Sequence, residues 1–123
     1  MPSATETAIQ RQLTKRFIAE NKLDIVLTPW AKTPNGSGGY RLAAGAPRSS
    51  QVMRLIAVNG QAEERMTLEG DVLHPGAILL GEWDAAVERH DRFEANGNRY
   101  EVLFVHEENA YQKKCEVAYL GPA

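Results

Sequence analysis

Residues 91–106 read DRFEANGNRYEVLFVH, and this stretch decides the fold. At its centre stands Asn96-Gly97, the preferred pair for a two-residue type I′ hairpin turn, because both turn residues need a positive φ. Placing the turn there sets the register of the two strands. Three compatible cross-strand pairs follow: Glu94 with Arg99 and Arg92 with Glu101 on one face, and Phe93 with Tyr100 on the other.

Short strands are expected on both sides of this hairpin. Val102 and Phe104 should continue the face of Tyr100. The run 84–90, which precedes the hairpin, is ambiguous between a helical turn and a strand. The predicted strands are Asp24–Thr28, Val52–Val58 before a turn at Asn59-Gly60, Arg65–Leu68 before Glu69-Gly70, Ala77–Leu80, and Lys113–Leu120 with Cys115, Val117 and Tyr119 on one side. Many short strands without helices between them predict a mainly β fold, a small antiparallel β-barrel or sandwich.

The N-terminal segment has a helical pattern. Ser3 followed by Glu6 matches the capping box that opens helices. A helix is expected over about residues 5–20, with a narrow apolar stripe typical of a helix on a surface: Ile9, Leu13 and Phe17. The expected organisation is therefore a helical segment, residues 1–22, before a single small barrel domain, residues 23–123.

One internal segment breaks this regularity. Residues 32–50, KTPNGSGGYRLAAGAPRSS, contain four glycines and two prolines. A loop this long inside a compact domain is uncommon, and it is usually functional or disordered. We expect a projecting loop with at most a brief strand at Tyr40–Leu42. Folded back as an open hairpin, it reaches about 25 Å at roughly 3.3 Å per residue.

Composition bounds the classes of function. The chain has 123 residues, enough for one domain, and 43% of them are hydrophobic. Its formal net charge of −2 lacks the positive excess of a protein that binds nucleic acid through phosphates. The single Cys115 excludes an internal disulfide and a multi-cysteine zinc site. Without a bilayer-length apolar run or a signal-peptide pattern, a small protein made in the cytoplasm is expected.

No residue pattern indicates a catalytic, cofactor or metal site. His74, His90 and His106 are evenly spaced, but equal spacing across separate strands has no geometric meaning. Cys115 lies in an alternating strand, where a cysteine behaves as a small buried hydrophobe. The glycines at 36–39 are not followed by the Lys-Ser or Lys-Thr of a phosphate-binding loop. We therefore expect no enzyme and no cofactor.

Four stretches together resemble a known family. They are Pro34–Tyr40 (PNGSGGY), Gln51–Ile56, Asp91–Val102 with its Asn-Gly turn, and Lys114–Leu120. In order and spacing, the chain resembles the head-closure or head–tail adaptor (connector, neck) proteins of tailed bacteriophages. The N-terminal helix departs from the compact members of that family, and the resemblance assigns it no role.

The resemblance implies a structural protein of the virion neck. Such a protein forms a six- or twelve-fold ring of itself below the portal, closes the DNA-filled head and offers a docking surface to the tail. Its implied partners are a portal or adaptor protein above and a tail-completion or tail-terminator protein below, with packaged DNA near it in the channel and no membrane. By position and composition, the residues implied to lie nearest the channel are Asn35, Gly36, Ser37, Gly38, Gly39, Tyr40 and Arg41.

Two alternatives remain from the residues alone. A small barrel of the OB type binds nucleic acid or another ligand through exposed aromatic and basic side chains. The candidates for this role are Trp30, Tyr40 and Trp83, with Arg41 and Arg48. A metal-dependent enzyme built on the three histidines is the second alternative.

Overall fold

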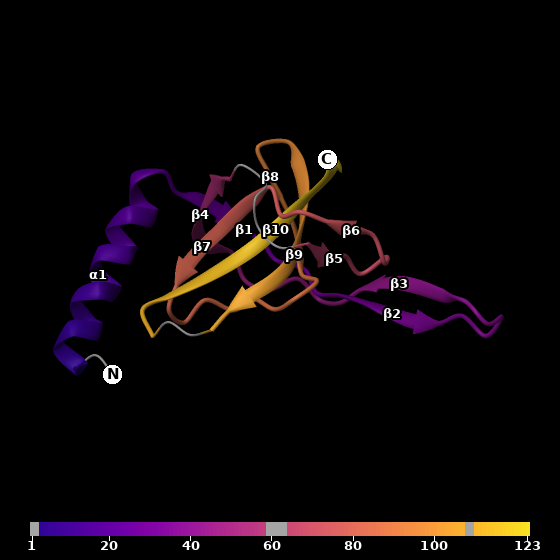
Figure 1. Ribbon diagram of the computed structural model, residues 1–123, viewed down its shortest axis with the longest axis horizontal. Coiled ribbons are helices and arrows are strands. Elements are labelled where there is room, and N and C mark those ends of the chain that lie inside the picture. The colour runs from indigo at the N-terminus through magenta and orange to yellow at the C-terminus, as the bar shows by residue number, and fades with distance from the viewer. Residues whose placement is uncertain (1–2, 59–63, 108–109) are drawn as a thin grey trace.

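The computed structural model describes residues 3–58, 64–107 and 110–123 of the chain (Figure 1). The turn predicted at Asn59-Gly60 lies outside the described residues. The elements are α1 (Ala4–Glu20), β1 (Leu23–Ile25), β2 (Trp30–Pro34), β3 (Tyr40–Ala44), β4 (Gln51–Ala57), β5 (Arg65–Met66), β6 (Val72–Leu73), β7 (Ala77–Glu82), β8 (Arg92–Ala95), β9 (Asn98–His106) and β10 (Gln112–Pro122). Among these residues, no helix is long and apolar enough to span a bilayer.

Six strands form one antiparallel sheet that curls into a nearly closed barrel. Their order is β1-β4-β7-β10-β9-β8. The edge strands approach each other, and two backbone hydrogen bonds of 2.9 Å join Thr28 to Arg92 across the seam. The interior holds a buried apolar cluster: Ile25, Leu27, Met53, Ala77, Leu79, Val87, Phe93, Ala95, Val102, Cys115 and Val117. The mainly β, barrel-like fold predicted from the sequence is confirmed.

The β8–β9 hairpin has the predicted register. Asn96 and Gly97 have φ angles of 53° and 78°, as a type I′ turn requires. All three predicted cross-strand pairs are present: Arg92 with Glu101, Phe93 with Tyr100, and Glu94 with Arg99. The rings of the aromatic pair stack with their centroids 5.2 Å apart. The local pattern was sufficient here because both strands and their turn fall within 15 residues of sequence.

A β-bulge overturns one predicted face. Val102 pairs with Val117, but Phe104 pairs with Glu116, so Leu103 is an extra residue on β9. The bulge reverses the alternation beyond it. Val105 therefore packs against the core, whereas Phe104 has the guanidinium of Arg65 over its ring and does not continue the face of Tyr100. The prediction for Phe104 was wrong because strict alternation admits no bulge.

Other boundaries also differ from the predictions. β5 is two residues long, where Arg65–Leu68 was expected, because the chain turns at Thr67–Gly70, where the N–H of Gly70 donates to the carbonyl of Thr67. β6 was not predicted, and β7 runs on to Glu82. The ambiguous run 84–90 is neither helix nor strand but a connection containing turns. These are short segments in which tertiary contacts outweigh local propensity.

α1 lies against the barrel with an unexpected face. Its first turn is capped as predicted, because the Ser3 hydroxyl accepts a hydrogen bond of 3.1 Å from the N–H of Glu6. The helix contacts β4 and β7, and its buried residues are Thr14 and Ile18. The predicted apolar stripe instead remains exposed on the helix: Ile9 and Leu13 at 56% each, and Phe17 at 40%.

The β5–β6 hairpin covers the outer side of β9 and β10, and a buried carboxylate holds each of its ends. Glu116, on β10, accepts two hydrogen bonds of 3.2 Å from the guanidinium of Arg65 and contacts the ring of His106. At the turn, the N–H of Leu68 donates to the fully buried Glu101 at 2.8 Å. These ionic contacts fix the hairpin to the barrel.

The pKa of Glu116 predicts how this contact responds to acid. Burial alone raises that pKa, but hydrogen bonds from Arg65 and His106 outweigh the burial and hold it below its usual value of 4.5. A carboxyl group with a lowered folded-state pKa contributes stability above its unfolded pKa, and this contribution is lost as the pH falls through the folded value. The Glu116→Gln variant should therefore be less stable than the unmodified protein near neutral pH, and the difference should shrink in acid.

Urea unfolding near neutral pH and near pH 3 measures this difference. Glu107→Gln is the matched control, since the Glu107 side chain is 74% exposed and lies 4.0 Å from Lys113. The control should lower the free energy of unfolding only slightly at either pH. A Glu116→Gln effect that is equal at both pH values would contradict the prediction.

Candidate functional site

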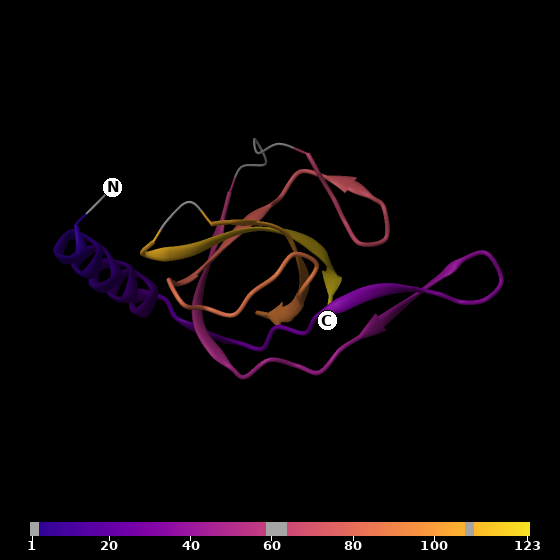
Figure 2. The ribbon, with the colours of Figure 1, turned by 90° about the horizontal axis from the view of Figure 1, so that it is seen from below.

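The β2–β3 hairpin projects from the barrel as an arm. We use this name for residues Trp30–Ala44. Figures 1 and 2 show it extending to the side of the barrel opposite α1. Its two strands form a regular antiparallel ladder: Trp30 with Ala44, Ala31 with Ala43, Lys32 with Leu42, Thr33 with Arg41, and Pro34 with Tyr40.

The arm corrects the prediction of an irregular loop over residues 32–50. The strand expected at Tyr40–Leu42 is present but extends to Ala44, and it pairs with an unpredicted strand. Gly36, Gly38 and Gly39 lie in the turn and leave the ladder uninterrupted. Pro34 occupies the last pair of a ribbon in which both strands are edges, where a residue without an N–H is tolerated. Within this segment, the turn at residues 35–39 and the stretch 45–50 lie outside the strands.

The tip of the arm is a compact turn built around Asn35. Its side-chain oxygen accepts hydrogen bonds from the N–H of Ser37 at 2.9 Å and the N–H of Gly39 at 3.2 Å. Gly36 and Gly38 have φ angles of 81° and 84°, which residues with a side chain rarely adopt. The sequence-predicted channel residues, Asn35 to Arg41, therefore all lie at the end of the arm.

The arm presents basic and aromatic groups to its surroundings. Tyr40 is 69% exposed, and the Nζ atom of Lys32 lies 5.9 Å from the centre of its ring. The sequence from residue 25 to residue 62 contains no acidic residue. Lys32 and Arg41 thus give the arm a charge of +2 on a chain whose net charge is −2. The arm is therefore suited to contact with an anionic neighbour.

An ion pair fixes the root of the arm. Arg48 follows β3 and donates from Nε and a terminal nitrogen to the two oxygens of Asp91, at 2.9 and 3.1 Å. Asp91 is 1% exposed and also accepts from the N–H of Glu88. The hydrogen bond to Asp91 raises the pKa of Arg48 above its ordinary value. This ion pair ties the root of the arm to the barrel.

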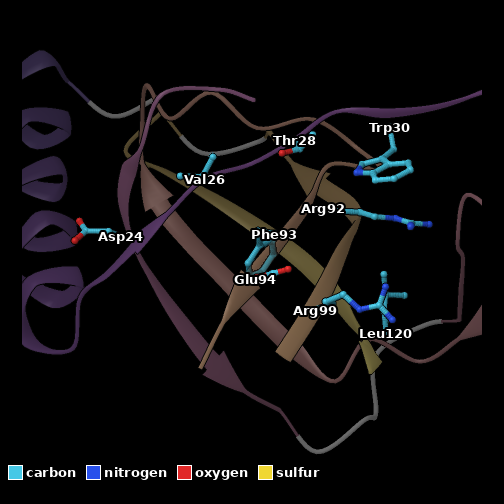
Figure 3. Close-up of a pocket in the computed structure, with 9 residues that line it drawn as sticks. All are labelled: Asp24, Val26, Thr28, Trp30, Arg92, Phe93, Glu94, Arg99 and Leu120. Carbon is cyan, nitrogen blue, oxygen red and sulfur yellow. The ribbon is translucent and has the colours of Figure 1, made fainter. Parts of the chain in front are cut away.

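A groove of about 460 Å³ opens where the arm joins the barrel (Figure 3). It lies over the seam between the chain after β1 and the strand β8. Its lining residues are Asp24, Val26, Thr28, Trp30, Arg92, Phe93, Glu94, Arg99 and Leu120. The guanidinium of Arg92 lies 4.8 Å from the centre of the Trp30 ring, which ties the first residue of the arm to the barrel. No sequence pattern indicates this groove, because its walls meet only when the barrel closes.

The structure separates the other candidate residues. His74, His90 and His106 each contact a different carboxylate, from Glu64, Glu101 and Glu116 respectively. In the described ranges, no group of three or more metal-ligating side chains is present. Cys115 is fully buried, and burial raises its pKa to about 12. The cysteine therefore stays a thiol at neutral pH.

The aromatic residues proposed for base stacking are also apart. Trp30 lies at the root of the arm and Tyr40 at its tip. Trp83 follows β7 and has the guanidinium of Arg11, from α1, 3.8 Å from its ring centre. Arg48, proposed as their basic neighbour, is bound to Asp91. These side chains form no shared stacking surface of the kind that single-stranded nucleic acids use.

No protein-family model matches the chain, and no curated protein sequence matches it. The described residues form an exposed basic arm that is tied to the barrel at its root, and a groove beside that root. These features are suited to assembly with other macromolecules.

Proposed function

We propose that the protein is a structural component of the neck of a tailed bacteriophage. In this role it forms a ring of identical chains below the portal, closes the DNA-filled head and offers the surface on which the tail docks. The observation that carries the proposal is the arm, a two-stranded ribbon that projects from a small barrel on a fixed root. The sequence resemblance to the head-closure family supports the same proposal.

The arm supports a role inside a channel. A two-stranded ribbon alone is marginally stable in water, so one that projects with most residues exposed gains stability from contact with a partner. In a ring, arms from several chains converge on the central opening. Each arm contributes only Lys32 and Arg41 as cations, which attract DNA without the many phosphate contacts of a tight DNA-binding protein.

The surfaces of α1 and the β5–β6 hairpin support association of identical chains. Head-to-tail contacts close into a ring when each subunit carries two different complementary surfaces. The protein exposes large apolar side chains on both the helix and the β5–β6 hairpin, including Leu13 at 56% and Met66 at 53%. Exposed apolar groups of this kind are typical of protein interfaces when they gather in patches.

The native mass tests the proposal. The purified protein is weighed by native mass spectrometry alone and after mixing with portal and tail components from the same virion. We expect conversion to a six- or twelve-fold ring upon addition of a portal or tail partner. A protein that stays monomeric with every such partner would overturn the proposal. If that monomer bound single-stranded DNA in a salt-dependent way, the small-barrel binding module would replace it.

A further inference from the structure

We propose that the exposed stripe of α1 in one chain docks on the outer face of the β5–β6 hairpin of a second copy. The stripe consists of Ile9, Leu13 and Phe17. The outer face consists of Met66 and Val72. This inference rests on the proposed function, because it names the contact between neighbouring chains of the ring.

The β5–β6 hairpin has its polar side inward and an apolar side outward. Arg65 and Thr67 face the barrel, where Arg65 binds Glu116 and Thr67 is 5% exposed. Met66 and Val72 are directly opposite each other in the ladder, and each is 53% exposed. A hairpin that turns charged groups inward and apolar groups outward suits a second contact on its outer side.

The α1 stripe is the matching surface on the other side of the molecule. The helix buries Thr14 and Ile18, whereas Ile9 and Leu13 each remain 56% exposed. Phe17, at the end of the stripe, packs one side of its ring against the Arg54 guanidinium at 4.0 Å. Residues at spacings of four form a continuous ridge on a helix, and such a ridge fits a flat apolar surface.

The two surfaces have complementary charges. Residues 4–22 contain four basic and two acidic side chains, a net of +2. Residues 64–73 contain three acidic side chains and one basic one, a net of −2. Arg16 lies one turn from Leu13 and is exposed, and Asp71 is exposed next to Val72. Opposite charges around an apolar centre favour this pairing and its register over helix–helix contact between two copies.

The positions of the two surfaces suit a ring. In both Figure 1 and Figure 2, α1 lies on one side of the barrel and the β5–β6 hairpin on the other. Two different surfaces on opposite sides give a head-to-tail contact, which continues from chain to chain and forms a ring where the rotation between neighbours closes. The tip of the arm belongs to neither surface, so it stays available for the channel.

Cysteine cross-linking tests this contact. Leu13→Cys and Met66→Cys are made in separate proteins, mixed, assembled with the portal and tail components and oxidised. Cys115 does not interfere, because it is fully buried and its pKa is raised to about 12. We expect a covalent dimer that contains one chain of each variant. A chain carrying both substitutions should give a ladder of covalent oligomers up to the size of the ring.

The matched control is Tyr119→Cys mixed with Leu13→Cys, since Tyr119 is 52% exposed but lies outside the proposed contact. A ring observed by native mass in which Leu13→Cys and Met66→Cys cross-link no better than this control would overturn the contact and leave the proposed function in place. Absence of any oligomer, with all variants folded, would overturn both.

Discussion

If the protein is the proposed neck component, shortening the arm should abolish DNA retention and tail joining while leaving the barrel folded. In the shortened variant, Asn-Gly replaces residues 33–41, which closes the ribbon with a two-residue turn after the Lys32–Leu42 pair. The free energy of unfolding should change by less than about 1 kcal/mol, because loop-closure entropy varies only logarithmically with length. On this proposal, particles assembled with the variant should lose their DNA, because the shortened arm would no longer reach the centre of the proposed channel. Their DNA content and the fraction with joined tails give the measurement.

A variant of unchanged length separates reach from turn chemistry. Asn35→Ala removes the side-chain oxygen that accepts from Ser37 and Gly39, but it keeps the length of the arm. Particles with this variant should keep most of their DNA. If the shortened variant retains DNA as well as the unmodified protein does, the arm has no role in closure.

Removing the Asp91 carboxylate should cause the largest loss of stability among substitutions at the arm. Asp91→Ala leaves the part-buried guanidinium of Arg48 without the two hydrogen bonds it donates, and it frees the N–H of Glu88. Breaking a buried ion pair from one side costs about 3–5 kcal/mol, and the lower end is expected here because Arg48 is 24% exposed. The Tm should fall by roughly 10 °C.

Thermal and urea unfolding measure this loss of stability. In the Asp91→Ala variant, the root of the arm should also become sensitive to proteases. Glu88→Ala is the matched control, because the Glu88 side chain is 78% exposed and lies 3.5 Å from the same guanidinium. It should cost less than about 1 kcal/mol. Equal losses for the two variants would show that the buried carboxylate does not hold the root.

The sequence determined the features that depend on near neighbours along the chain. The Asn96-Gly97 turn and the alternation around it predicted the β8–β9 register pair by pair, because φ preferences and strand alternation act within a few residues. The capping of α1 at Ser3 was predictable for the same reason. The sequence predicted only part of the structure of the arm. Its position and its glycine-rich tip were clear, but the ladder that makes it a ribbon was not.

Only the tertiary structure decided which surfaces meet. Arg48 and Asp91 are 43 residues apart, and their ion pair forms because the seam of the barrel brings β8 beside the segment after β3. The bulge at Leu103 and the exposed side of α1 likewise depend on how several strands fit together. Periodicity shows that a face is apolar, but it does not show what will cover that face. The residues that cover an apolar face are distant from it in sequence. Their contacts form together when the barrel closes.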